Sequence, residues 1–168
     1  MKVYISGKIG EEVISDATRE KFARAQAMLE AKGYEVFNPV SEKWQRMLKE
    51  EYEIQFFDHK KTIPTSSVSF YTYALLRDQM VLTIKDAVYF LDDWNRSPGA
   101  KSEYYFVKAV GKRFFFQDRH DAAEYLIERM HKEAKANGKP VGYENLKNRN
   151  DIEIAYFTKH LDEAWLPL

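Results

Sequence analysis

Short apolar runs alternate with longer stretches of mixed polarity over residues 1–117. The runs are rich in β-branched and aromatic residues, which is typical of buried strands. They predict four strands, at residues 2–6, 34–39, 86–93 and 113–117.

The stretches between the runs place apolar residues at helical spacing. In the first of them Phe22, Ala25 and Leu29 repeat on one face, and Ser15 or Asp16 can cap the start. Patterns of this kind predict helices at about 17–32, 41–57, 72–85, 97–112 and 120–138.

A strand, a helix and a strand joined by short links form a βαβ unit, which implies a parallel sheet with a right-handed crossover. The alternation therefore predicts a doubly wound, Rossmann-like α/β fold. We expect a parallel sheet of four to five strands in flavodoxin-like order, with helices on both faces. In that order the first and third strands lie side by side.

Two segments depart from the alternation. Residues 41–70 form an insert, predicted as a helix and an exposed loop over 58–70 that cover one rim of the domain. After the 1–117 domain, residues 118–168 form a helical C-terminal extension that packs on the domain or on a partner subunit. Within it, 139–150 is a polar link, and 151–168 is a helix, or a strand and a helix, rich in Ile, Tyr, Phe and Trp.

Composition excludes several classes of protein. Lys+Arg and Asp+Glu both number 26, so the chain lacks the broad basic field of a general nucleic-acid binder, and no extended nucleic acid is expected as a partner. The absence of cysteine excludes disulfides and thiolate chemistry. No signal peptide is evident, and no apolar run approaches the ~20 residues that cross a bilayer. We expect a cytoplasmic protein with no membrane partner.

Ligands of open parallel sheets bind at the carboxyl ends of the strands. The loop after the first strand offers Ser6, Gly7, Lys8 and Ile9. The loop after the third offers Asp93, Trp94, Ser97 and Gly99. If the two strands are neighbours, these loops share one crevice. The first loop has neither the dinucleotide nor the P-loop spacing, and an ordinary strand-to-helix turn is the alternative interpretation.

The second loop leads into a helix. Ser97 can cap this helix and Pro98 suits its first position, so the N–H groups of Gly99 and Ala100 would face outward at a positive helix end that can hold a phosphate or carboxylate. A simple helix cap is the alternative for Ser97.

Glu103 occupies an unusual position on this helix. At about 100° per residue, one face collects Ala100, Glu103, Val107 and Val110, and the opposite face collects Lys101, Lys108 and Lys112. A buried carboxylate is costly unless it is paired or used. The helix dipole favours a negative charge near the N-terminus, but it does not explain why Glu103 lies on the apolar face. Glu103 is therefore a candidate nucleophile or acid/base.

A second acid, Asp78, interrupts an apolar helical stretch. It is either a salt-bridged helix residue beside Arg77, which the spacing favours, or an acid aimed into the same crevice. The four histidines include no pair at ligand spacing, so we expect no metal site and no cofactor.

Three segments resemble the nucleoside 2-deoxyribosyltransferase superfamily, which includes the 2'-deoxynucleoside 5'-phosphate N-hydrolases. "VYISGKI" places Tyr4 at the position of an active-site tyrosine. "LRDQMVLTIKDAVYFL" places Asp78 at that of a catalytic-site aspartate, and "SPGAKSEYYFVKAVGK" places Glu103 at that of the catalytic glutamate.

The resemblance implies a mechanism. In the superfamily the glutamate attacks the anomeric carbon, releases the base and forms a glycosyl-enzyme ester that a second base or water resolves. Asp78 would handle the proton on the base, or position the base, and Tyr4 would orient Glu103 or the sugar. Trp94 would either stack on the base or act as a lid over the pocket. Family members often complete the site from a neighbouring subunit, which implies a homodimer or a higher homo-oligomer.

Ser97 bears on the substrate. Transferases that use unphosphorylated nucleosides carry an aspartate there, whereas the nucleotide hydrolases carry a serine that contacts the 5'-phosphate. With Lys8 and Gly99 nearby, the resemblance favours a nucleoside 5'-monophosphate over a nucleoside.

Two other hypotheses stay open: a non-catalytic binder of a nucleotide or nucleotide-sugar, and a structural oligomer that works through its aromatic tail.

Overall fold

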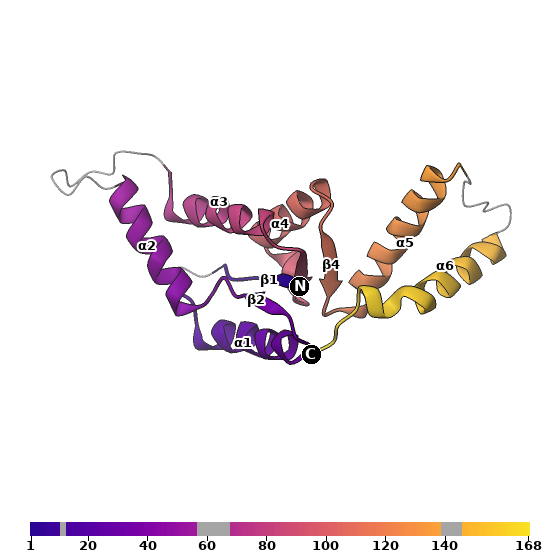
Figure 1. Cartoon of the computed structure of the whole chain (residues 1–168), viewed down its shortest axis with the longest axis horizontal. Helices are drawn as coiled ribbons and strands as arrows, with labels where there is room; N and C mark the ends of the chain where they lie inside the picture. The colour runs from indigo at the N-terminus through magenta and orange to yellow at the C-terminus, as the bar shows by residue number, and fades with distance from the viewer. Residues whose placement is uncertain (11–12, 57–67, 139–145) are drawn as a thin grey trace. The chain divides into compact units, whose positions relative to one another are not determined.

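The computed structural model describes residues 1–10, 13–56, 68–138 and 146–168 (Figure 1). The chain divides into two compact units, Met1–Arg113 and Phe114–Leu168. The strands are β1 (Lys2–Ser6), β2 (Glu35–Phe37), β3 (Ala87–Phe90) and β4 (Arg113–Phe116). The longer helices are α1 (Asp16–Ala31), α2 (Glu42–Phe56), α3 (Phe70–Thr83), α4 (Pro98–Ala109), α5 (Arg119–Ala136) and α6 (Leu146–His160).

The strands form one sheet in the order β2-β1-β3-β4. β1 pairs in parallel with both β2 and β3, and its last residue, Ser6, lies opposite Phe90 at the end of β3. The predicted Rossmann-like α/β fold is therefore confirmed, including the neighbouring first and third strands. Because parallel neighbours end at the same edge, the loops after β1 and β3 start side by side.

Helices lie on both faces of the strands, with α1 below β1 and β2 in Figure 1 and with α3 and α4 above. Of the two predicted caps of α1, Ser15 is the one used, and its hydroxyl accepts from the N–H of Thr18. Phe22, Ala25 and Leu29 are all buried, as their helical spacing predicts.

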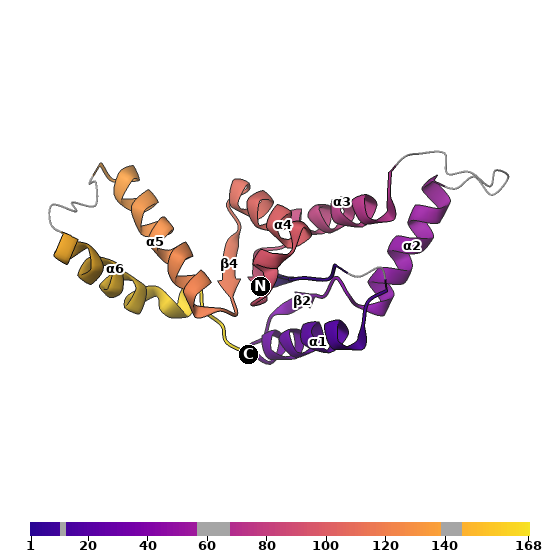
Figure 2. The ribbon, with the colours of Figure 1, turned by 180° about the vertical axis from the view of Figure 1, so that it is seen from behind.

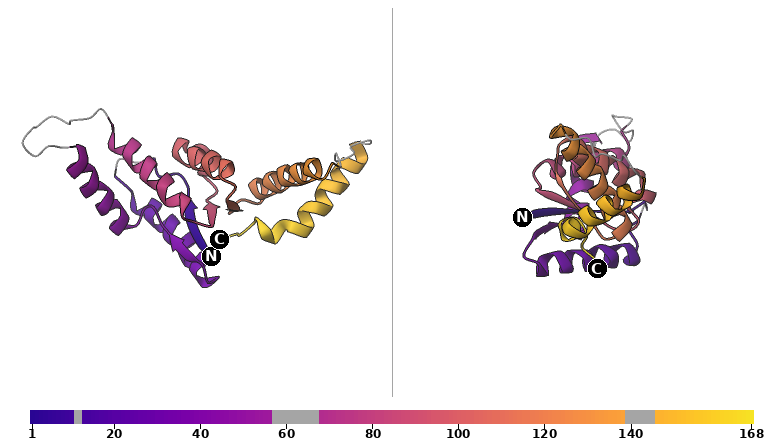
Figure 3. Two further views of the ribbon diagram at one scale, coloured as in Figure 1. Left: turned by 45° about the horizontal axis from the view of Figure 1, so that its top comes forward. Right: turned by 90° about the vertical axis from the view of Figure 1, so that its right-hand side faces the viewer.

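α2 confirms the helix predicted in the insert, and α2 and α3 pack against each other (Figure 3). α3 begins at Phe70, two residues before the predicted start, because Ser69 caps it by accepting from the N–H of Thr72 at 3.1 Å. The predicted loop is thus wrong at Phe70, and its residues 58–67 lie outside the described residues.

α4 begins as predicted, with Ser97 as its cap and Pro98 as its first residue, but it ends earlier than expected. Ala109 is its last residue, and Gly111 follows with a φ of 69° in the left-handed region. Val110 is consequently 49% exposed, so its predicted place on the buried stripe is wrong.

The second unit is built on α5 and α6, which pack together (Figure 2). Arg129 of α5 donates to the hydroxyl of Tyr156 on α6 at 3.0 Å and pairs at 2.8 Å with Glu163, which follows α6. After α6 comes a short 3-10 helix, Leu161–Glu163, and Trp165 then forms a parallel bridge with Phe116.

The extension departs from prediction at both ends of its last helix, and α6 stops at His160 instead of continuing toward Leu168. α6 already begins at Leu146, inside the predicted polar link. Residues 139–145 of that link lie outside the described residues. Within the described ranges, no helix combines the length and apolar character that crossing a membrane requires.

Candidate active site

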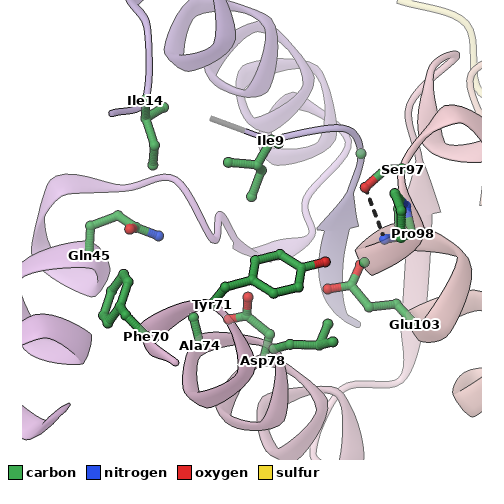
Figure 4. A pocket seen from close by; sticks show the side chains of 15 residues that line it. Ile9, Ile14, Gln45, Phe70, Tyr71, Ala74, Asp78, Ser97, Pro98 and Glu103 are labelled. Carbon is green, nitrogen blue, oxygen red and sulfur yellow. Dashed lines mark hydrogen bonds between the residues drawn. The ribbon is translucent and has the colours of Figure 1, made fainter. Parts of the chain in front are cut away.

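A pocket of about 510 Å³ opens in the first unit, at the edge where β1 and β3 end (Figure 4). Its walls come from the β1 loop, α2, α3 and the start of α4. The lining residues are Gly7, Ile9, Gly10, Ile14, Gln45, Phe70, Tyr71, Ala74, Leu75, Asp78, Ser97, Pro98, Gly99, Ala100 and Glu103. The two acids singled out in the sequence thus meet in one cavity, and both carboxyl groups point into it near the ring of Tyr71 (Figure 4).

Both carboxylate oxygens of Glu103 accept a hydrogen bond. The hydroxyl of Tyr4 donates to Oε1 at 2.8 Å, and the hydroxyl of Ser6 donates to Oε2 at 2.5 Å. Tyr4 is fully buried, and Glu103 is only 6% exposed. The carboxyl group is therefore held at both oxygens while its residue lines the pocket.

Strand geometry explains why Tyr4 and Ser6 act together. Successive side chains of a strand point to opposite faces, so residues two apart point to the same face. On β1 that face carries Tyr4 and Ser6, and the hydrogen bonds show that Glu103 of α4 lies over it. The helical position of Glu103 and the alternation along β1 together build the contact.

Burial dominates the electrostatics of Glu103. Desolvation raises the pKa of this carboxyl from its ordinary value of 4.5 to about 7, although the hydrogen bonds from Ser6 and Tyr4 act in the opposite direction by stabilising the charged form. A carboxyl that titrates near neutral pH in a cavity can serve as a nucleophile or as an acid/base.

Asp78 is the second buried carboxyl. The indole N–H of Trp44, on α2, donates to its Oδ1 at 2.9 Å. Burial raises the pKa of Asp78 well above the ordinary value, and the nearby charge of Glu103 raises it further, while the bonds from Trp44 and Tyr4 lower it. When one of two close carboxyls ionises, the other keeps its proton more firmly.

The salt-bridge interpretation of Asp78 is wrong. The neighbouring guanidinium of Arg77 pairs instead with Glu51 of α2, at 3.0 Å. Asp78 faces the pocket, and within the described residues no lysine or arginine lines that pocket.

The β1 loop contributes backbone and an apolar side chain to the pocket. Gly7 and Ile9 line it, whereas Lys8 is exposed and does not. The N–H of Lys8 donates to Asp93 at 2.9 Å, and Asp93 also pairs with Lys21 of α1. Asp93 thus connects the β3 loop to the β1 loop and to α1. It is not among the residues that line the pocket.

The β3 loop divides between lining and packing. Ser97 and Gly99 line the pocket. The hydroxyl of Ser97 accepts from the N–H of Ala100 at 3.2 Å, so the prediction of an outward-facing N–H is wrong at Ala100. Trp94 stacks on Tyr104, with ring centroids 4.7 Å apart, and is not a lining residue.

Much of the apolar wall was absent from the sequence prediction. It consists of Ile14, Phe70, Tyr71, Ala74 and Leu75. A signal was available for the members on α3, because they precede Asp78 at helical spacings of three, four, seven and eight residues. Ile14 precedes α1 and carried no such signal.

Two residues of α2 were missed as well. Trp44 holds Asp78, and Gln45 lines the pocket while its amide nitrogen donates to the carbonyl of Pro39 at 2.6 Å. No sequence pattern pointed to either, because their place depends on how the insert packs against α3.

Among the described residues, one group has the composition of a metal site: Asp118, His120 and Asp121, in the second unit. Its arrangement has a structural cause. Oδ1 of Asp118 accepts from the backbone N–H groups of His120 and Asp121 at 2.8 and 3.0 Å, which caps α5.

Comparison with known proteins bears on the first unit and the start of the second. No curated protein and no solved structure matches the chain significantly. One family model does match, over residues 1–116, and this span contains every residue of the pocket and both buried acids. The chain therefore belongs to the family described as "Domain of unknown function (DUF4406)".

Proposed function

We propose that the protein cleaves or transfers the N-glycosidic bond of a nucleoside 5'-monophosphate or nucleoside, through a glycosyl-enzyme intermediate on Glu103. One observation carries the proposal: a buried carboxyl, bound at both oxygens by Tyr4 and Ser6, belongs to the same pocket as a second buried carboxyl, Asp78. Two carboxyls with different environments are the usual equipment for breaking a glycosidic bond with retention.

The environments of the two acids support different roles. The hydroxyls of Tyr4 and Ser6 stabilise the charged form of Glu103, and the resulting charge helps to keep the proton on Asp78. Glu103 is therefore the better nucleophile and Asp78 the better proton donor.

In the first step a carboxylate oxygen of Glu103 attacks C1' of the sugar. The C1'–O bond forms as the C1'–N bond breaks, and the electron pair of the broken bond goes to the base. Asp78 gives its proton to the departing base, which leaves neutral. The products are the free base, a glycosyl ester on Glu103 and an ionised Asp78.

In the second step an acceptor resolves the ester. Water, or a nitrogen of a second base, attacks C1' and the bond to Glu103 breaks, so the carboxylate is restored. Asp78 takes the proton that the acceptor loses, and the enzyme returns to its starting state.

The walls of the pocket suit such a substrate. Ile9, Ile14 and Phe70 provide apolar surface for the flat faces of a base. The start of α4, at Ser97 and Gly99, offers a positive helix end for the 5'-phosphate.

The direct test is release of free base from a panel of deoxynucleosides, ribonucleosides and their monophosphates, followed by chromatography. Glu103→Gln should lower the rate at least about 1000-fold because the nucleophile is lost. Glu53→Gln is the matched control, because Glu53 is exposed on α2. Mass spectrometry should detect a glycosyl adduct on the wild type that Glu103→Gln lacks.

Two outcomes would contradict the proposal. One is base release by Glu103→Gln at the wild-type rate. The other is tight calorimetric binding of an intact nucleotide by the wild type with no turnover, which would favour a binding protein.

The resemblance also implies a homo-oligomer. Leu76, Met80 and Ile84 recur every fourth residue along α3 and its C-terminal cap, and each is more than half exposed. A second copy of the chain would cover this apolar stripe. Light scattering should then give a mass above that of the 19.8 kDa monomer, and Met80→Glu should lower it.

A further inference from the structure

Trp44 reaches Asp78 from outside the segments that resemble the deoxyribosyltransferases. It lies in the first turn of α2, within the insert, and its indole N–H donates to Oδ1 of Asp78 at 2.9 Å. Asp78 lies 34 residues further along the chain and is only 8% exposed. The contact therefore joins the insert to a buried acid of the pocket.

The chemistry of the indole fixes more than a distance. An indole N–H can only donate, so Oδ1 must act as the acceptor in this bond. The hydroxyl oxygen of a protonated carboxyl is a poorer acceptor than its carbonyl oxygen. When Asp78 is neutral, Oδ1 is therefore the carbonyl oxygen and the proton is on Oδ2.

Aromatic packing holds the indole in place. Trp44 meets Phe37 of β2 edge to face, with ring centroids 4.9 Å apart, and Phe37 stacks on Tyr4 at 5.4 Å. Such contacts restrict ring orientation and add stability beyond area burial. One aromatic row thus runs from the residue that binds Asp78 to the residue that binds Glu103.

We propose that Trp44 is a positioning residue, which orients the carboxyl of Asp78 and assigns its proton to Oδ2 for delivery to the leaving base. The delivery of the proton to the base rests on the proposed function, whereas the orientation of the Asp78 carboxyl by Trp44 does not.

Few other groups act on this carboxyl. Glu103 of α4 and Tyr4 of β1 both act on the carboxyl of Asp78, Glu103 by its charge and Tyr4 by a hydrogen bond. Among the described residues, no cation contributes to its electrostatic environment. Removing the indole donor should therefore have an effect on Asp78 that no other positive group masks.

The first test reads Asp78 in the free protein. Infrared difference spectra across a pH titration record the C=O band of a protonated carboxyl, and Asp78→Asn identifies which band is Asp78. Loss of the indole donor destabilises the charged form, so Trp44→Phe should raise the midpoint of this band by about one pH unit and shift its frequency.

Two companions make this test specific. Replacement of Trp44 by β-(3-benzothienyl)alanine keeps the ring shape and removes only the N–H, so it should reproduce the shift even if Trp44→Phe disturbs folding. Trp165→Phe is the matched control, because its indole N–H donates to the carbonyl of Gln117 in the other unit. An unchanged midpoint in both Trp44 variants would overturn the inference.

The second test reads the reaction. In both Trp44 variants the alkaline limb of kcat/KM should move upward with the infrared midpoint, and kcat should fall about tenfold with little change in KM. A fall in rate without movement of the limb would reduce Trp44 to a packing residue and overturn the positioning role. If no substrate releases base, the proposed function fails, while a shifted infrared midpoint still supports control of Asp78 by Trp44.

Discussion

The hydroxyl of Tyr4 donates a hydrogen bond to Oε1 of Glu103, a residue 99 positions away in the sequence, at 2.8 Å. Both side chains are buried, and the bond connects β1, an inner strand of the sheet, to the pocket. It stabilises the charged form of Glu103 against the desolvation that raises the pKa of this carboxyl to about 7. The balance between these two effects decides at which pH Glu103 can act.

Loss of either hydroxyl should move the acid limb of the pH–rate profile. In the wild type, kcat/KM should rise with pH through an apparent pKa of about 7, because Glu103 must be ionised. Tyr4→Phe and Ser6→Ala each remove a donor to the carboxylate, so each should raise this pKa by about one unit. Part of the lost rate should return at high pH.

Tyr105→Phe is the control for this profile, since Tyr105 is exposed on the same helix as Glu103. A limb that stays in place in both Tyr4→Phe and Ser6→Ala would contradict the role of the hydroxyls.

Glu103→Gln should stabilise the fold at high pH. Because the folded pKa of Glu103 lies near 7 and its ordinary value is 4.5, the folded chain holds a proton between these values that the unfolded chain has released. The wild type therefore loses stability as the pH rises through this window. At pH 8 the variant should gain about 1–3 kcal/mol in free energy of unfolding, and the gain should disappear below pH 4.5.

Urea denaturation at several pH values measures this difference. Glu53→Gln, at an exposed site on α2, should change little at any pH. An equal effect of Glu103→Gln at low and at high pH would show that the carboxyl is not desolvated as described.

Gly7→Ala should destabilise the β1 loop. A Cβ at this position would lie 2.6 Å from Cδ1 of Leu91, the fully buried residue that follows β3. Overpacking of this kind costs about 1–3 kcal/mol, and thermal unfolding would measure it. Gly99→Ala is the milder counterpart, because its nearest neighbour, the hydroxyl of Tyr71 at 3.2 Å, belongs to an exposed side chain that can move.

Leu91→Ala removes Cγ and Cδ1, the atom of the closest clash, and tests the mechanism of this destabilisation. In that background Gly7→Ala should cost less than in the wild type, as expected of residues in contact. Additive losses would place the cause elsewhere.

Ser97→Asp should alter the choice of substrate. Aspartate is as good a helix cap as serine, so α4 should remain intact. Its negative charge at the pocket wall would repel a 5'-phosphate, and kcat/KM for monophosphates should fall about 10-fold or more relative to nucleosides. Ser102→Asp, outside the lining on the same helix, is the control. An unchanged preference between monophosphates and nucleosides would exclude a phosphate-binding site at Ser97.

The parallel sheet and the buried position of Glu103 follow from the sequence pattern. Alternation of short apolar runs with amphipathic stretches forces parallel strands, and parallel neighbours bring the ends of β1 and β3 to one edge. Helical spacing alone predicted Glu103 on the buried side of α4, because the sequence shows a charged residue at a position of the apolar stripe. Where a prediction failed locally, as at Val110, a glycine in the left-handed region had ended the helix.

The partners of Glu103 and Asp78 depend on how separate elements pack together. Asp78 could have paired with its neighbour Arg77. Because α2 packs on α3, Arg77 instead forms a salt bridge with Glu51, and Asp78 accepts a hydrogen bond from Trp44. Spacing within one helix cannot express a contact that depends on a second element packing against it. The hydroxyls of Tyr4 and Ser6 reach Glu103 for the same reason, because strand β1 and helix α4 meet only when the chain folds.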